Sequence, residues 1–83
     1  MNLCPEQYDA IEIQAVRMEI GHDGKTICFP CRPDEADLWS IYAHLKEGGV
    51  EWLCDRETKV HALAGGYALA TMWRLPVYDL TRQ

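Results

Sequence analysis

Apolar and polar residues alternate through the first part of the chain, and this pattern predicts a β-hairpin. In the first strand, Tyr8–Ile20, the alternation changes phase at residues 15–16, where we expect a β-bulge. The sequence Gly-His-Asp-Gly at residues 21–24 predicts a tight turn, because glycine tolerates positive φ angles and aspartate bonds its own backbone. The second strand covers Lys25–Cys31. Pro30 has no N–H to donate, so this strand lies at a sheet edge or ends there.

The rest of the chain predicts two helices that alternate with two short strands. The first helix is expected to begin with Asp34 as its N-cap and to reach Lys46, where the glycine pair at residues 48–49 ends it. Its apolar residues have the spacing of one helix face: Leu38, Ile41, Tyr42 and Leu45. The later elements are a strand over residues 50–54, a helix from the N-cap Thr58 to residue 73 or 74, and a strand over residues 75–80.

These elements follow one another in the order β-β-α-β-α-β, which is typical of the α+β class. We expect one domain over residues 1–83, built as a two-layer sandwich in which both helices cover one face of a four-stranded mixed sheet. The last helical crossover should join parallel strands.

The charge of the chain is acidic and unevenly distributed. Its 83 residues carry a formal net charge of −5. The first 37 residues contain eight acidic and three basic side chains, and the remainder contains five of each. This balance argues against sequence-independent nucleic-acid binding, which needs Lys and Arg to neutralise phosphates. It favours association with a partner that has a basic surface.

No segment has the pattern of a membrane span or a signal peptide. No apolar run approaches the length needed to cross a bilayer, and the residues that follow Met1 have neither a basic region nor an apolar core. We therefore expect a cytoplasmic protein with reduced thiols.

The motif Cys28-Phe29-Pro30-Cys31 is the main candidate for chemistry. A Cys-x-x-Cys pair serves thiol-redox catalysis when its first cysteine lies at a helix N-terminus. It forms a zinc site when further ligands complete it, for which the candidates are Cys54, Cys4, His22 and His61. The ordinary alternative is that these thiols fill a small core, as cysteine often does. No arrangement of nucleophile, base or paired carboxylates predicts catalysis, and no cofactor is expected.

The helix that follows Thr58 has two apolar faces, of which one must face something other than the sheet. The face expected to pack on the sheet carries Val60, Leu63, Ala64, Tyr67 and Thr71. The opposite face carries Ala62, Gly66, Leu69 and Trp73. This second face is expected to pack on the neighbouring helix or to form a homodimer surface.

The surface around the first predicted helix combines carboxylates with an aromatic residue. Tryptophan surrounded by polar residues is typical of binding interfaces. The expected partner-binding residues are Asp34, Glu35, Asp37 and Trp39, with Trp73 as a secondary contact, and Glu12 and Glu19 extend the acidic surface.

A small, acidic chain without a catalytic motif resembles the inhibitor proteins encoded by phages, including anti-CRISPR proteins. The resemblance lies in size, charge and architecture over residues 1–83. It implies binding without turnover, in the cytoplasm of the host cell, by acidic and aromatic groups that occupy the basic surface of a nucleoprotein complex. The competing hypothesis is a thiol-redox or zinc protein centred on the Cys28–Cys31 motif.

Overall fold

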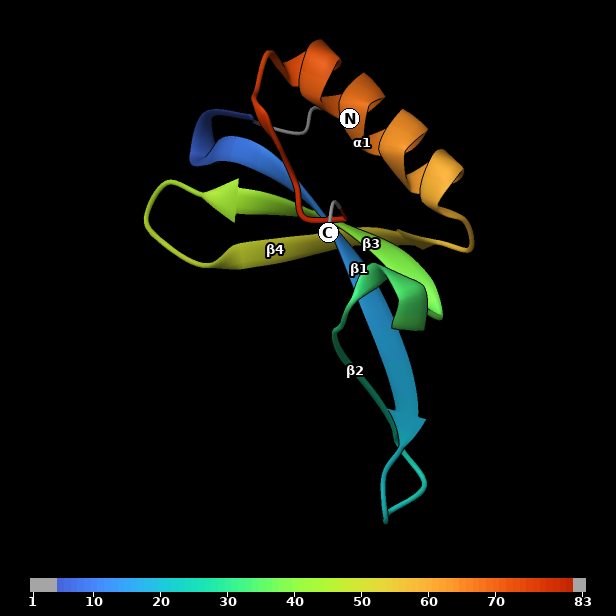
Figure 1. Cartoon of the computed structure of the whole chain (residues 1–83). Helices are drawn as coiled ribbons and strands as arrows, with labels where there is room; N and C mark the ends of the chain where they lie inside the picture. The colour runs from blue at the N-terminus through green and yellow to red at the C-terminus, as the bar shows by residue number, and fades with distance from the viewer. Residues whose placement is uncertain (1–4, 82–83) are drawn as a thin grey trace.

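The computed structural model describes residues 5–81, which form a strongly bent sheet with one helix against it (Figure 1). Its strands and helices are η1 Pro5–Gln7, β1 Tyr8–Ile20, β2 Thr26–Pro30, η2 Pro33–Glu35, β3 Leu38–Leu45, β4 Val50–Arg56, α1 Lys59–Trp73 and β5 Val77–Asp79, where η denotes a 3-10 turn. The α+β class is confirmed, but the sheet has five strands and a single α-helix covers it. That helix is not long and apolar enough to cross a membrane, and no other described helix is.

The long strand β1 organises the sheet. The strand order is β2-β1-β3-β4, all antiparallel, and β5 pairs with β1 in parallel. Since β4 and β5 run in the same direction, the expected parallel crossover through α1 is confirmed. Residues 8–16 of β1 pair with β3, whereas residues 16–20 pair with β2.

The predicted hairpin is confirmed, but the bulge lies elsewhere. The register of β1 shifts between Tyr8 and Ala10, not at residues 15–16. Residue 16 is instead where β1 passes from β3 to β2, and the side chains beyond it are exposed. The apolar phase therefore changes because the strand leaves the core, without any interruption of its pairing at that point.

The prediction of a helix from Asp34 to Lys46 is wrong. Only the 3-10 turn η2 forms at its start, and residues 38–45 form the strand β3 between β1 and β4. In this strand Trp39, Ile41 and Ala43 share one face, because strand side chains alternate. The apolar spacing that resembles a helix also fits a central strand, and pairing on both sides stabilises the strand.

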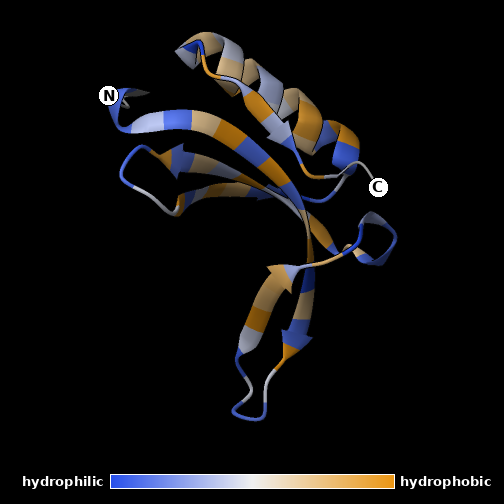
Figure 2. Ribbon diagram, turned by 60° about the vertical axis from the view of Figure 1, so that its left-hand side comes forward, coloured by the Kyte–Doolittle hydropathy of each residue, from blue (hydrophilic) through white to orange (hydrophobic). Residues whose placement is uncertain are grey.

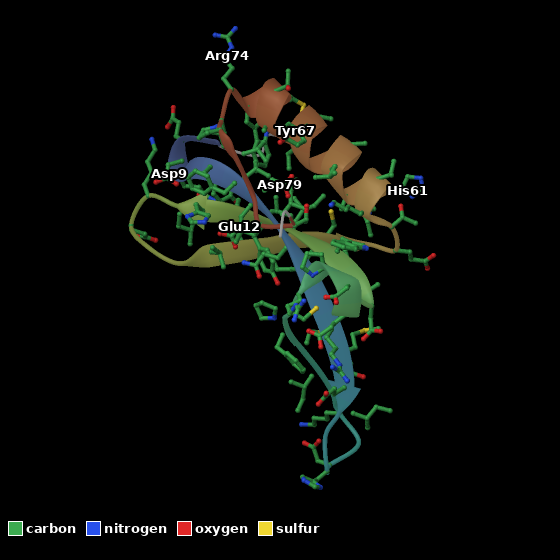
Figure 3. All side chains as sticks on the ribbon, in the orientation of Figure 1. Asp9, Glu12, His61, Tyr67, Arg74 and Asp79 are labelled. Atoms are coloured by element: carbon green, nitrogen blue, oxygen red, sulfur yellow. The ribbon has the colours of Figure 1, made fainter. Side chains whose placement is uncertain are left out.

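The helix α1 begins and ends as the sequence predicts. Thr58 is its N-cap, since the side-chain hydroxyl accepts a hydrogen bond from the backbone N–H of His61 at 3.1 Å. It ends at Arg74, which has a left-handed backbone with φ 57° and donates its N–H to the carbonyls of Ala70 and Thr71. This backbone conformation closes the last turn, and Figure 3 shows the Arg74 side chain pointing away from the body.

The helix presents to the sheet the face that the sequence pattern predicts to lie against a neighbouring helix or a second copy of the chain. Ala62, Gly66 and Ala70 are its buried residues, and Leu69 and Trp73 pack against the core. Val60 and Tyr67 of the other face are exposed. The proposed homodimer surface of Ala62, Gly66, Leu69 and Trp73 is therefore covered by the protein's own sheet. Small residues bring the helix backbone close to the strands, which explains why this face packs inward.

The core lies between α1 and one face of the sheet. Its buried cluster consists of Tyr8, Ile11, Ile41, Ala43 and Ala70. Gly66 packs over the side chain of Ile13, so closely that a β-carbon there would lie 2.6 Å from Cδ1 of that isoleucine. The opposite face of the sheet carries no helix within residues 5–81, and we call it the open face.

Candidate functional site

Beyond its last pair with β3, strand β1 continues into a projecting hairpin, residues 17–30, which we call the hairpin arm (Figure 2). Most side chains of the arm are exposed. Three of them are large and apolar, namely Met18, Ile20 and Ile27, which are 40%, 79% and 52% exposed. The register places Met18 and Ile20 on one face of the arm and Ile27, the partner of Glu19, on the other. Exposed apolar groups on a projecting element are typical of protein interaction sites.

The acidic turn, residues 33–37, lies at the base of this arm and links β2 to β3. Asp37 accepts a hydrogen bond from the backbone N–H of Met18 at 2.8 Å. The carboxylate of Glu35 lies 3.8 Å from the guanidinium of Arg17, a residue of the arm. The structure therefore brings Asp34, Glu35 and Asp37 together as exposed groups beside the apolar residues of the arm.

The two tryptophans of the predicted site do not join this surface as expected. Trp39 lies on β3, opposite Ala15, and is half-buried instead of standing on a helix surface. Trp73 stacks on Tyr8 with ring centroids 5.4 Å apart and packs against the core. Glu12, expected in the acidic surface, is only 7% exposed. The acidic surface consequently lies around the turn and the arm, without Trp73 or Glu12.

The cysteines of the proposed zinc site do not meet. Cys28 lies in β2 and Cys31 follows it, whereas Cys54 lies in β4 at the opposite edge of the sheet. Among residues 5–81, no three His, Cys, Asp or Glu side chains are placed to hold a metal ion. The combination of Cys28, Cys31 and Cys54 as metal ligands is therefore wrong, and Cys4 lies outside the described residues.

The surroundings of Cys31 are unlike those of a redox cysteine. Partial burial raises the pKa of its thiol, and the carboxylates of Glu35 and Asp37 raise it further, against an opposite effect of Arg17. A redox cysteine needs a lowered pKa, because the thiolate is the attacking species. The helix N-terminus that would lower it is absent, since only a 3-10 turn follows the motif.

A row of large side chains crosses the open face of the sheet. The strand register aligns Trp52 of β4 with Tyr42 of β3, then with Glu12 of β1 and Tyr78 of β5. Trp52 is 58% and Tyr78 48% exposed. Three aromatic rings therefore flank one carboxylate on a face that α1 leaves uncovered.

A hydrogen-bond network holds this carboxylate at the middle of the row. Glu12 lies 2.6 Å from Nε2 of His44 and also accepts a hydrogen bond from the side-chain amide of Gln14. The ring of His44 meets that of Tyr78 edge-on, with centroids 5.3 Å apart. Figure 3 shows Glu12 on the sheet, apart from the helix that carries His61 and Tyr67.

A second anchored pair lies at the β4 end of the row. The indole N–H of Trp52 donates to Oδ1 of Asp55 at 2.9 Å, and the same oxygen accepts a hydrogen bond from Ser40. Residues three apart on a regular strand face opposite sides. Here they share the open face because the register of β4 shifts between its pairs with Ile41 and Tyr42.

The sequence pattern does not predict a site at these open-face residues. The pattern predicts Tyr42 on the apolar face of a helix, and no motif includes Trp52 or Asp55. A signal was present, because apolar and polar residues alternate from Trp39 to Leu45 as they do on a strand with one covered face. The meeting of Trp52 with Asp55 depends on a bulge, which the alternation does not reveal.

A shallow depression of about 200 Å³ lies beside β1, between the end of β5 and the end of β2. Its lining residues are Gln14, Ala15, Pro30, Cys31 and Leu80. The side-chain carbonyl oxygen of Gln14 is buried without a hydrogen-bond partner, since the amide nitrogen is directed to Glu12. The depression contains no group with catalytic geometry among the described residues.

The structure thus presents two candidate surfaces, the hairpin arm with its acidic turn and the open face. Comparison of the chain with protein-family models, curated proteins and solved structures finds no match.

Proposed function

We propose that this protein is a non-catalytic inhibitor or adaptor that binds a basic, nucleic-acid-binding protein through its hairpin arm and acidic turn. The observation that carries the proposal is the exposure of Met18, Ile20 and Ile27 on a projecting hairpin beside the carboxylates of Glu35 and Asp34. Apolar contacts at the centre and charged groups at the rim are the arrangement found in protein interfaces.

The charges of this surface favour a basic partner. Arg17 lies between Glu19 and Glu35, at 3.5 and 3.8 Å, and Arg32 lies 3.5 Å from Asp34. Acidic groups still outnumber basic ones over the first 37 residues, and these pairs are exposed, so water screens them. Such a surface speeds encounter with a positively charged protein and repels nucleic acid itself.

The profile of the chain extends the proposal to a class of partner. Phage-encoded inhibitors of the anti-CRISPR type are small, acidic and without enzymatic motifs, and block nucleoprotein effectors by occupying basic surfaces. On this proposal the protein acts in the host cytoplasm against such a complex, by binding without turnover.

The experiment is affinity capture from bacterial lysate, with bound proteins identified by mass spectrometry. Wild type should enrich a specific basic nucleic-acid-binding protein. The double variant Ile20→Ser/Ile27→Ser should reduce this capture at least about tenfold, since interface anchors contribute most of the binding energy. The charge variant Asp34→Asn/Glu35→Gln should reduce it less and should make it less sensitive to salt.

The matched control is Val60→Ser/Met72→Ser, which removes comparable exposed apolar groups from the outer face of α1. It should capture as wild type does. Equal capture by the arm variant and wild type, or equal loss in the α1 control, would show that the arm is not the binding surface.

A further inference from the structure

The open face carries a second feature with binding chemistry, the pair formed by Trp52 and Asp55. We infer that this pair binds an arginine side chain of an extended, basic segment of the partner protein, with the guanidinium stacked on the indole and paired with the carboxylate. The inference deepens the proposed function and rests on it for the basic character of the partner.

The geometry of the pair is fixed before anything binds. The bulge in β4 places both side chains on one face, and the indole N–H is held by Oδ1 of Asp55 at 2.9 Å. Ser40 is 2% exposed and donates to the same oxygen. A ring held in this way keeps its orientation, so binding a ligand costs less conformational entropy.

The carboxylate keeps one oxygen for a ligand. Both hydrogen bonds of the Asp55 side chain use Oδ1, and Oδ2 has no partner among the described residues. The neighbouring Arg56 donates to the backbone carbonyl of Asp55 at 3.1 Å and not to its carboxylate. No Lys or Arg of residues 5–81 lies within ion-pair distance of this carboxylate.

The negative charge of the open face favours a positively charged ligand. The register gives the open face two carboxylates, Asp55 and Glu12, of which Glu12 is buried beside His44. Arg56 pairs with Trp39 and so belongs to the opposite face, and no other Lys or Arg lies at the positions where β3 pairs with β4 or β1, or β5 with β1. A second copy of the chain would bring carboxylates against carboxylates, and a nucleic acid would bring phosphates. A basic segment is the occupant that this charge complements.

The aromatic ring selects arginine over lysine. Trp52 is 58% exposed, and an indole offers the strongest cation–π surface among side chains. A planar guanidinium can stack on the ring while the N–H groups along its edge donate to a carboxylate. An ammonium group is compact and has no flat face, so it does not make both contacts as well. Tyr42 and Tyr78 continue the row, so an extended segment has further aromatic contacts across the sheet.

The test is an NMR titration of the isotope-labelled full chain, with the indole N–H signals of its three tryptophans resolved. The probe is a blocked Gly-Ser peptide that carries three spaced arginines, compared with the same peptide carrying lysine or citrulline. The Trp52 signal should shift and saturate with the arginine peptide, while Trp39 and Trp73 signals stay in place. Lysine should bind at least about threefold more weakly, and citrulline should not bind.

Two substitutions separate the site from general attraction. Asp55→Asn keeps the acceptor for Trp52 and Ser40 but removes the charge, and it should weaken binding at least about fivefold. Glu47→Gln removes the same charge from the exposed turn between β3 and β4, which belongs to neither binding surface, and should leave the titration unchanged. Folding of both variants is checked by the dispersion of the amide spectrum.

The inference is overturned if the Trp52 signal does not move, if citrulline binds as arginine does, or if both substitutions weaken binding equally. These outcomes are independent of lysate capture, which reports on the hairpin arm. Peptide binding at Trp52 without capture would therefore refute the proposed function and leave the arginine site standing, and capture without peptide binding would do the reverse.

Discussion

At the scale of single residues, Gly66 sets the distance between helix and sheet. A β-carbon at this position would lie 2.6 Å from Cδ1 and 2.9 Å from Cγ1 of Ile13, a fully buried side chain. Alanine in a helix is favoured over glycine by about 1 kcal/mol, but overpacking a core costs about 1–3 kcal/mol. We expect Gly66→Ala to lower the free energy of unfolding by about 1 kcal/mol in urea denaturation.

The neighbouring glycine provides the control for this prediction. A β-carbon at Gly65 would lie 3.4 Å from Cδ1 of Ile41, an ordinary contact distance. Gly65→Ala should therefore raise the free energy of unfolding by up to about 1 kcal/mol. If both substitutions stabilise the protein, the Ile13 side chain or the helix moves enough to accept a β-carbon at position 66 without loss of packing energy.

The sequence could predict individual residues only where their role is local. Thr58 as an N-cap and the glycine turn at residues 21–24 follow from backbone chemistry, and both are found. The open-face pair of Trp52 and Asp55 depends on register between strands, and so does the burial of Glu12. Residue type alone carries no information about such neighbours, and for this reason the sequence predicts Glu12 on the surface although the structure buries it.

At the scale of elements, residues 38–45 show how two periodicities can share one segment. The stripe of Leu38, Ile41 and Leu45 fits a helix, while Trp39, Ile41 and Ala43 fit one face of a strand. Local propensity does not decide between them. Pairing with β1 on one side and β4 on the other satisfies the backbone hydrogen bonds of the strand, and β1 lies far away in sequence.

The bounds of α1 agree with the prediction from the sequence, but the opposite face of the helix packs on the sheet. Apolar residues surround it almost completely, so no stripe identifies the face that packs on the sheet. The small residues Ala62, Gly66 and Ala70 recur every fourth position, which places them together on one face. The face of α1 that packs on the sheet is therefore the one whose small residues let the helix backbone come close to the strands, and not the one with the larger apolar side chains.

The N-cap of α1 contributes to stability in a way that can be measured separately. The hydroxyl of Thr58 satisfies the backbone N–H of His61, which has no acceptor within the helix. We expect Thr58→Ala to lower the free energy of unfolding by about 1 kcal/mol, and Thr58→Ser to change it by a few tenths. Urea denaturation followed by circular dichroism measures both. Equal loss in the serine variant would assign the effect to the threonine methyl group.

At the scale of the whole molecule, the structure divides into a packed body and an arm that adds nothing to the core. The body contains every residue of the buried cluster, all of which belong to β1, β3 or α1. The arm extends the β1–β2 ladder beyond it with exposed side chains on both faces. The apolar side chains of the arm contribute little to folding, since they bury little surface.

This division predicts two levels of protection against hydrogen exchange. Amides of residues 11–13 and 41–43 lie in the packed body, so they should exchange only through global unfolding, with rates that depend steeply on urea. Amides of residues 17–20 and 26–29 should exchange by local opening of the arm, with protection about a hundredfold lower and little dependence on urea.

The variant Ile20→Ser/Ile27→Ser should leave protection of the body unchanged, because both isoleucines are exposed. If the arm instead shows the same urea dependence as the body, the two unfold as one unit, and the arm is a stabilising part of the fold as well as a surface.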